Sequence, residues 1–154
     1  MRSILLSTAA LAAILPLSAA HAETDSNTLP EVVVTATRLP AIVADTPGAR
    51  AIDARTIERR GAVFAADILT DIPGLSVYRA GFGGVASVRI RGVSQDKSLV
   101  LVDGVPVNDA SQPAGGFDFS GFDLGDIQRV EVLSGPQSSL WGSDAIGGVI
   151  AFTS

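Results

Sequence analysis

The side chains that most often carry out chemistry in enzymes are scarce in this chain. There is no cysteine, the only histidine is His21, and the only lysine is Lys97. His21 lies in a segment predicted to be removed, so the remainder lacks the commonest general base, the thiolate nucleophile and the usual zinc ligands. Serine–lysine chemistry would need a serine activated by Lys97, whereas Ser94 to Ser98 has the composition of an exposed turn. We therefore expect no catalytic residues and no enzyme activity.

Groups that could hold an ion, a phosphate or a nucleic acid also lack the required pattern. Asp118, Asp123 and Asp126 do not have the spacing of a calcium-binding loop. The glycine-rich stretch at residues 80–85, AGFGGV, is not followed by the lysine-bearing helix of a phosphate-binding loop. The chain carries 11 basic and 16 acidic residues, with the arginines scattered among carboxylates. The sequence thus predicts no metal site, no cofactor and no nucleic-acid partner.

The N-terminus has the features of a secretory signal peptide. Arg2 supplies a positive charge, Ile4 to Leu17 is almost entirely apolar, and Ala20-His21-Ala22 is a small-x-small cleavage site. A membrane anchor is the alternative, but this stretch is shorter than the ~20 residues that span a bilayer, and Pro16 interrupts it. We predict a signal peptide over residues 1–22, with cleavage after Ala22.

The next segment combines a polar tail with a short β-branched run. Residues 23–30 (ETDSNTLP) have no apolar periodicity and are predicted to be flexible, and residues 39–46 are expected to be a linker. Between them lies EVVVTAT, which consists of Glu31, Val32, Val33, Val34, Thr35, Ala36 and Thr37. A β-branched run in a flexible tail is suited to adding itself to the sheet edge of another protein. The alternative is an internal strand of the domain that follows.

The first half of that domain is predicted to contain a short strand at residues 49–52 and two helices. Asp53 is a suitable N-cap, Ile57 an apolar anchor, and Gly61 a left-handed stop for a helix that ends at Arg60. A second helix is expected over residues 62–71, ended by Pro73-Gly74.

Strands are then predicted at residues 75–79, 86–92, 99–103 and 105–107. In the second of these, Val88 and Ile90 alternate with Ser87, Arg89 and Arg91, which predicts an apolar face and a charged face. Residues 99–102 are apolar at every position, as in a strand covered on both sides. Two glycine-rich stretches, residues 80–85 and 108–121, are predicted loops that carry several phenylalanines. The C-terminal segment should form a strand at residues 129–133, a helical turn at 138–141 and a strand from Val149.

Several phrases of the sequence resemble one known family. They are DILTDIPGLSV, VRIRGVSQDKSLVLVDGVPVND and DIQRVEVLSGPQSSLWGSDAIGGVIAFTS, which together cover residues 67 to 154. They are similar to the plug domain of TonB-dependent outer-membrane receptors, nearest in phrasing to the cobalamin transporters, with siderophore receptors close behind. The EVVVTAT run resembles the TonB box of that family. The resemblance implies an α+β domain: a small mixed β-sheet with short helices and long glycine-rich loops.

The resemblance also implies roles for particular residues. Residues 31–37 would bind TonB, and Arg89, Arg91 and Glu131 would form charge pairs between plug and barrel. Ser134 departs from the family, which often has a basic residue there. The substrate site is expected to take contacts from the loops, with Phe82, Asn108, Gln112 and Phe117 as candidates. The alternative for at least half of the loop phenylalanines is packing onto the domain's own core.

The expected organisation is a signal peptide at 1–22, a tail at 23–45 and a plug domain at 46–154. The implied function is gating and substrate binding in uptake of cobalamin or a ferric siderophore, here without the β-barrel. Implied partners are TonB with its inner-membrane energising complex, a barrel in cis or in trans, and a small nutrient chelate. The implied location is the periplasmic side of the outer membrane of a Gram-negative bacterium. The alternative is a free-standing, soluble periplasmic module that binds TonB or a ligand.

Overall fold

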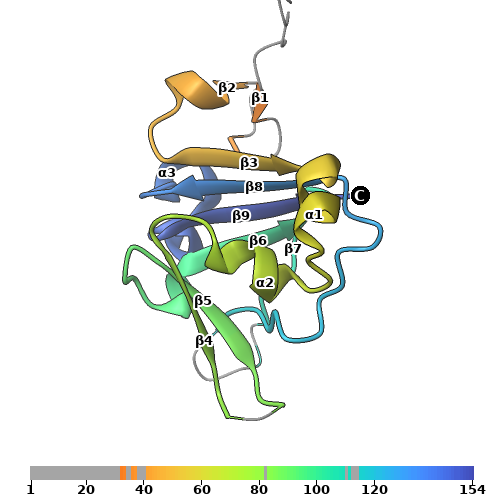
Figure 1. Ribbon diagram of the computed structural model, residues 1–154. Helices are drawn as coiled ribbons and strands as arrows, with labels where there is room; N and C mark the ends of the chain where they lie inside the picture. The colour runs from red at the N-terminus through yellow and green to blue at the C-terminus, as the bar shows by residue number, and fades with distance from the viewer. Residues whose placement is uncertain (1–31, 34–35, 38–40, 82, 110, 112–114) are drawn as a thin grey trace, which may run out of the picture.

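The computed structural model describes residues 32–33, 36–37, 41–81, 83–109, 111 and 115–154. Its centre is a five-stranded sheet (Figure 1). In order across the sheet, the strands are β3 (Ala49–Asp53), β8 (Arg129–Ser134), β9 (Gly148–Thr153), β6 (Ser98–Val102) and β7 (Val105–Pro106). β6 and β9 run parallel, and the other neighbouring strands run antiparallel. The expected α+β class with a small mixed sheet is therefore confirmed.

Two further strand pairs lie outside this sheet. β4 (Leu75–Arg79) pairs antiparallel with β5 (Ala86–Ile90), and β1 (Val32–Val33) pairs antiparallel with β2 (Ala41–Ile42). Figure 1 shows β1 and β2 beyond the β3 edge of the sheet, while the tip of the β4–β5 hairpin points away from that edge. The sheet thus separates the N-terminal strand pair from the tip of the hairpin.

Three short helices accompany the strands. α1 (Ala54–Arg60) begins at Asp53, whose side chain accepts a hydrogen bond from the amide of Thr56, and it ends at Gly61, where φ is 63°. α2 (Ala65–Thr70) begins three residues later than predicted, because Phe64 is extended, with ψ of 149°, and forms an antiparallel β-bridge with Asp123. α3 (Ser138–Trp141) has the predicted bounds. The caps of α1 were therefore predictable, but the start of α2 depends on a partner distant in sequence.

The described residues also include short 3-10 helices. These are η1 (Val43–Asp45), η2 (Gln95–Lys97) and η3 (Ser143–Ala145). The first of them, together with β2, lies in the stretch that was expected to be a linker. Its C-terminal residue is followed by Thr46, whose hydroxyl donates to the carbonyl of Ile42 at 2.9 Å. The described part of that stretch is thus ordered by local hydrogen bonds.

The two faces of the sheet pack against different elements. One face carries larger apolar side chains and packs with α1, α2 and the β4–β5 hairpin; its strand residues include Ile52, Val100, Val130, Val132, Ile150 and Phe152. The other face carries smaller side chains and packs with Ala36, Trp141 and Ala145; its strand residues are Ala49, Leu99, Leu101, Leu133, Val149 and Ala151. We call the second face the small face. Helix α3 lies behind the sheet in Figure 1, on the opposite side from α1 and α2.

Strand β5 ends earlier than the alternation of its sequence predicts. Val88 and Ile90 are buried and Arg89 is exposed, as expected, but Ser87 is also buried. The strand stops at Ile90 because Arg91 adopts a φ of 52°, which is outside the extended region. The amide of Arg91 donates to the carbonyl of Gly74 at 2.7 Å, which fixes this turn.

Candidate functional site

The expected partner-binding segment lies at the N-terminal end of the described chain. Val32, Val33, Ala36 and Thr37 are described, whereas Glu31, Val34 and Thr35 lie outside the described residues. Val32 pairs with Ile42 and Val33 with Ala41. This short pair is not part of the five-stranded sheet. Val32 and Val33 therefore form a strand, β1, that lies outside the five-stranded sheet.

Ala36 connects this segment to the small face. It is fully buried, and its amide donates to Glu131 Oε2 at 3.3 Å. Its carbonyl accepts a hydrogen bond from Trp141 Nε1 at 2.8 Å. Both backbone groups of Ala36 thus bond to residues about a hundred positions away, one on β8 and one on α3. A residue in the middle of the expected flexible tail is held by the core.

Glu131 is placed by β8 on the small face. Its side chain is 1% exposed, and its Oε1 lies 2.8 Å from Nε of Arg129 on the same strand. The two residues are two positions apart, so they share a face of the strand. A buried carboxylate needs an opposite charge and hydrogen-bond donors, and here Arg129 and the amide of Ala36 supply them. The structure therefore pairs Glu131 with Arg129 and with the N-terminal segment.

Arg89 and Arg91 lie apart from Glu131 in the described chain. Arg89 is exposed on β5, and Arg91 is exposed in the turn after it. The guanidinium of Arg91 is near Gly48, because a Cβ built on Gly48 would lie 3.3 Å from its Nη2. Among the described residues neither arginine forms an ion pair with a carboxylate. Their expected role in pairing with a barrel stays a prediction.

The loop residues expected to contact a substrate have other described contacts. The side-chain oxygen of Asn108 accepts from the amide of Val100 at 2.7 Å, and its Nδ2 donates to the carbonyl of Ser98 at 2.9 Å. Phe117 makes edge contacts with Phe119 and Phe122, with ring centroids 4.9 and 5.4 Å apart. Phe82 and Gln112 lie outside the described residues. Asn108 and Phe117 therefore stabilise the loop against the domain, and a substrate contact remains a prediction.

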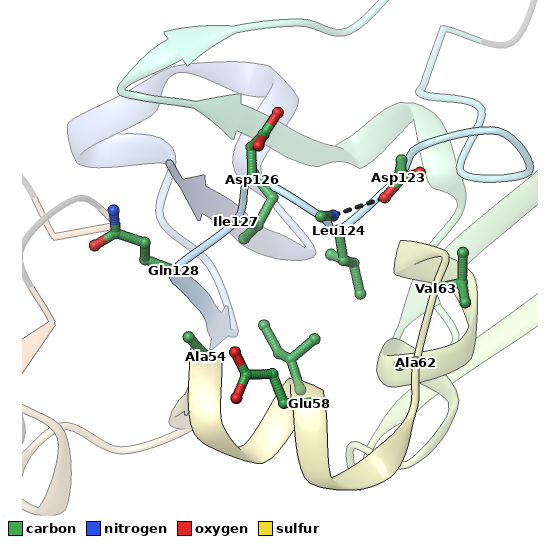
Figure 2. A pocket seen from close by; sticks show the side chains of 11 residues that line it. Ala54, Glu58, Ala62, Val63, Asp123, Leu124, Asp126, Ile127 and Gln128 are labelled. Atoms are coloured by element: carbon green, nitrogen blue, oxygen red, sulfur yellow. Dashed lines mark hydrogen bonds between the residues drawn. The ribbon is translucent and has the colours of Figure 1, made fainter.

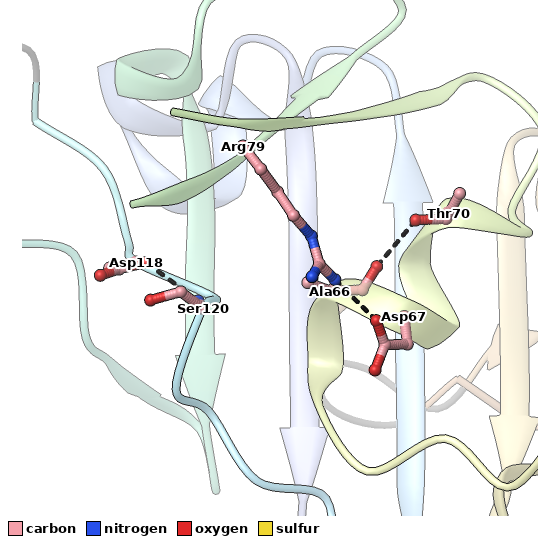
Figure 3. A network of polar contacts seen from close by, with 6 residues as sticks. All are labelled: Ala66, Asp67, Thr70, Arg79, Asp118 and Ser120. Atoms are coloured by element: carbon pink, nitrogen blue, oxygen red, sulfur yellow. Dashed lines mark hydrogen bonds and ion pairs between the residues drawn. The ribbon is translucent and has the colours of Figure 1, made fainter. Parts of the chain in front are cut away.

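A polar network joins the hairpin to α2 and to the second loop (Figure 3). Arg79 Nη2 lies 2.6 Å from Asp67 Oδ1, and both side chains are about half exposed. Asp118 Oδ1 accepts from the amides of Ser120 and Ala86, each at 2.9 Å. Burial tends to raise the pKa of Asp118, but hydrogen bonds from these two amides and from the Ser120 side chain together outweigh it and hold that pKa below its ordinary value. The ionised carboxylate of Asp118 thus attaches the loop that contains it to the start of β5.

A shallow pocket of about 520 Å³ lies between α1 and the segment that precedes β8 (Figure 2). Ala54, Ile57 and Ala62 form part of its apolar lining. Three carboxylates also line it: Glu58, Asp123 and Asp126. Asp123 Oδ1 accepts a hydrogen bond from the amide of Gly125 at 2.6 Å, which stabilises the turn that contains both residues. The pocket brings together no nucleophile and base.

The described residues contain neither a metal-binding cluster nor a helix that could span a membrane. In that part of the chain, no three His, Cys, Asp or Glu side chains come together to hold a metal ion. No helix among the same residues is long and apolar enough to cross a bilayer. What distinguishes the described chain chemically is therefore the N-terminal segment and its contacts with the small face.

The fold and the sequence match proteins of known class. The family model of the TonB-dependent receptor plug domain matches residues 43–149. This chain belongs to the TonB-dependent receptor plug domain family.

Individual relatives agree with this assignment. The vitamin B12 transporter BtuB of Vibrio vulnificus is 41% identical over 97% of this chain and 24% of the transporter. The siderophore receptor PirA of Pseudomonas aeruginosa is 31% identical, covers 71% of this chain and 19% of its own, and has a TM-score of 0.52. The alcaligin outer-membrane receptor FauA of Bordetella pertussis is 25% identical, covers 80% of this chain and 21% of its own, and has a TM-score of 0.62. The chain spans about a quarter of the length of the curated relatives it matches.

Sequence reasoning missed two parts of the Ala36 contact. No contact was predicted for Trp141, and no role was predicted for Arg129. One signal was present: Glu131 lies in an otherwise apolar strand, RVEVLS, where a charged side chain needs partners. Nothing in the sequence identifies Ala36 as the donor, because the two residues are far apart along the chain.

Proposed function

We propose that this chain is the gating and substrate-binding plug of an outer-membrane receptor that takes up cobalamin or a ferric siderophore. The observation that carries the proposal is the match to a vitamin B12 transporter, which extends over 97% of the chain and so includes the N-terminal segment. The siderophore receptors among the structural neighbours support the wider substrate class. The role is binding and transmission of force, and not enzyme catalysis.

Residues 31–37 are the proposed binding site for TonB, which acts with its inner-membrane energising complex. Within it Val32–Val33 form β1, which pairs with β2 and is not part of the five-stranded sheet. Strand addition needs mainly backbone hydrogen bonds, so a short segment can transmit a directed pull without a large interface. A pull on this segment would then displace part of the plug.

The barrel is the second proposed partner, in cis or in trans, and Arg89 and Arg91 are the proposed contacts with barrel carboxylates. Both guanidinium groups are exposed and make no ion pair with a described carboxylate. The glycine-rich loops, including Asn108 and Phe117, are the proposed floor of the site for a nutrient chelate. The proposed location is the outer membrane, with the N-terminal segment facing the periplasm.

Binding to TonB is the first test of this function. The full chain, exported so that a leader is removed, is titrated with the C-terminal domain of TonB by calorimetry. Val33→Pro removes a backbone donor and disfavours an added strand, so we expect at least a tenfold loss of affinity. Ser26→Pro, the same change outside residues 31–37, is the matched control and should bind like the unaltered chain. Absence of binding by the unaltered chain, or equal binding by Val33→Pro, would contradict the proposed TonB site.

Transport is tested at the level of the gene. The nucleotide sequence beyond the codon of Ser154 should encode alternating strands of ~10 residues, in frame or displaced by one frameshift. A receptor restored in this way should support cobalamin- or siderophore-dependent growth of a strain that lacks its own receptor. Growth that needs neither the plug nor the barrel would contradict the proposal.

A further inference from the structure

The β4–β5 hairpin has one face that packs with the domain and one face that does not. Side chains alternate between the two faces of a strand, and Arg79 points toward Asp67 of α2 (Figure 3). Tyr78, the preceding residue, therefore points to the opposite face. It pairs with Ser87 in the register of the hairpin, and Arg89 lies two positions further along β5 on the same face. We call this second face the outer face of the hairpin.

The outer face of the hairpin is hollowed. A hollow of about 390 Å³ lies there, which is within the ~300–1,000 Å³ that is usual for ligand pockets. Ser87 is 7% exposed, whereas Tyr78 is 61% exposed and Arg89 is exposed as well. Ser87 therefore lies at the bottom of the hollow, and the other two side chains form part of its rim. The remaining lining residues are Ala80, Val85, Ser94 and Gln95.

Several polar groups in this hollow are not used by the described part of the domain. No hydrogen bond or ion pair with another described residue is formed by the side chains of Tyr78, Ser87, Arg89 and Gln95. The hydroxyl of Ser87 is the most telling of these, because a buried polar group without a partner costs free energy that a bound ligand can restore. The hollow thus offers unused hydrogen-bonding groups at its bottom and at its rim.

The charge of the hollow favours an anion. Among the described residues that line it, Arg89 alone is charged. Asp96, which follows Gln95 in the chain, is paired with Lys97, with 3.2 Å between Oδ2 and Nζ. A guanidinium can donate two parallel hydrogen bonds to one carboxylate, and hydroxyl and amide groups beside it can donate more. A carboxylate therefore suits the donors of this hollow.

The apolar part of the hollow favours a ring attached to that carboxylate. Tyr78 and Arg89 are diagonal neighbours on the hairpin, roughly 7–8 Å apart, which is within reach of aromatic and long side chains. A ring bonded to a carboxylate at Arg89 can thus pack against the ring of Tyr78. Val85, which is 43% exposed, supplies further apolar surface. One small molecule with both groups can use the whole hollow.

We propose that the outer face of the hairpin is a binding site for a small aromatic carboxylate. Arg89 binds the carboxylate, and Ser87 and Gln95 donate further hydrogen bonds to it. Tyr78 and Val85 pack against the ring. The inference does not rest on the proposed function, because every group that forms the site belongs to this chain.

An NMR titration of the full exported chain with benzoate tests the site. Tyr78 is the only tyrosine of the chain, so its ring signals report directly on the hollow. We expect benzoate to shift these signals and the amide signal of Arg89 saturably, in the millimolar range. Benzamide keeps the ring without the charge, and acetate keeps the charge without the ring. Each should bind about tenfold more weakly than benzoate, because it uses only half of the site.

Substitutions assign the two halves of the site to particular side chains. Arg89→Gln removes the charge and should weaken benzoate about tenfold. Arg55→Gln, the same change at an exposed arginine of α1 outside the hollow, is the matched control and should leave the affinity unchanged. Tyr78→Ser removes the ring and should reduce the affinity for benzoate to that for acetate. Because Tyr78 is largely exposed, this variant keeps the test decisive if Arg89→Gln does not fold.

Several outcomes would overturn the site. Benzoate shifts that do not saturate, or that spread evenly over the chain, would show that there is no defined site. Equal affinity for benzoate and benzamide would contradict recognition of the charge, and equal affinity for benzoate and acetate would contradict recognition of the ring. An equal loss in Arg89→Gln and Arg55→Gln would mean that only net charge matters. Failure of TonB binding or of transport would contradict the proposed function and would leave these titrations unchanged.

Discussion

Individual hydrogen-bonding side chains decide where the elements of this domain begin and where its loops are attached. Asp53 begins α1, Asn108 holds β6, and Asp118 attaches a loop to β5. Each of these side chains satisfies main-chain amides that would otherwise lack a partner. Their effects should therefore appear as changes in stability, and these can be measured one residue at a time.

Asp53 provides a prediction with a defined pH dependence. Hydrogen bonds from Thr56 hold the pKa of Asp53 below its ordinary value of 3.8. Its contribution is therefore fully present above the ordinary value and is lost as the pH falls through the lowered value. We expect Asp53→Ala to lower the free energy of unfolding by about 1 kcal/mol at pH 7, and by less at pH 2.

The control for this prediction is Asp53→Asn, which keeps a capping oxygen without the charge. It should retain most of the stability at pH 7 and lose the difference between pH 7 and pH 2 at this site. Urea unfolding followed by circular dichroism measures both variants. An equal loss for Asp53→Ala at the two pH values would contradict the role of the carboxylate.

Phe117 tests whether a loop aromatic belongs to the core. Its ring contacts Phe119 and Phe122, and it is half-buried against the main apolar cluster. We expect Phe117→Ala to lower the free energy of unfolding by about 1–2 kcal/mol, which is less than the ~3–5 kcal/mol for the fully buried Phe152. Denaturant unfolding is the measurement. A change near zero for Phe117→Ala would favour a ring reserved for a ligand.

At the scale of elements, main chains approach one another closely at the start of β9. Gly148 has a φ of 146°, and a Cβ at this position would collide with the carbonyl oxygen of Leu133 on β8. β9 pairs with β8 on one side and with β6 on the other, so a displacement here disturbs both ladders. Glycine at position 148 is thus required by the packing of strands.

A pair of glycine substitutions tests this requirement. Gly61→Ala should cost roughly 1–2 kcal/mol, because its φ is 63° but no atom lies within 4 Å of the added Cβ. Gly148→Ala carries a similar conformational penalty and a collision with main chain, so we expect a loss of at least about 3 kcal/mol. Thermal unfolding compares the two variants. Equal losses would mean that backbone conformation alone requires glycine at Gly148.

For the whole molecule, the two faces of the sheet pack against different parts of the chain. The larger side chains on one face hold α1, α2 and the hairpin. The small face holds α3 and Ala36. Several large apolar side chains stay exposed in the described structure, among them Val63, Tyr78, Val85 and Val105.

The leader is a prediction about the whole chain. Expression in a Gram-negative host should give an exported product that begins at Glu23, because the small-x-small site ends at Ala22. Mass spectrometry of the periplasmic and membrane fractions measures the N-terminus. Changing Ala22 to Arg should block processing, while the same change at Ala12 should instead interrupt the apolar stretch and reduce export. A product that retains residues 1–22 in both fractions would contradict a cleaved leader.

Local signals in the sequence determined much of the fold. Turn residues and alternation placed β4, α3 and the cap of α1, because these features depend on neighbours a few positions away. The local sequence also predicted that Val32 and Val33 favour a strand. It likewise indicated that Glu131, in an apolar strand, needs charged or hydrogen-bonding partners. The family phrases supplied the class of the protein.

Other features were decided only by tertiary structure. The start of α2 depends on the bridge between Phe64 and Asp123, the end of β5 on the carbonyl of Gly74, and the burial of Ala36 on Glu131 and Trp141. These partners are far apart along the chain, and no local periodicity records a contact between them. The sequence alone therefore determined that a strand-forming segment precedes the domain, and the packed sheet decided where that segment is held.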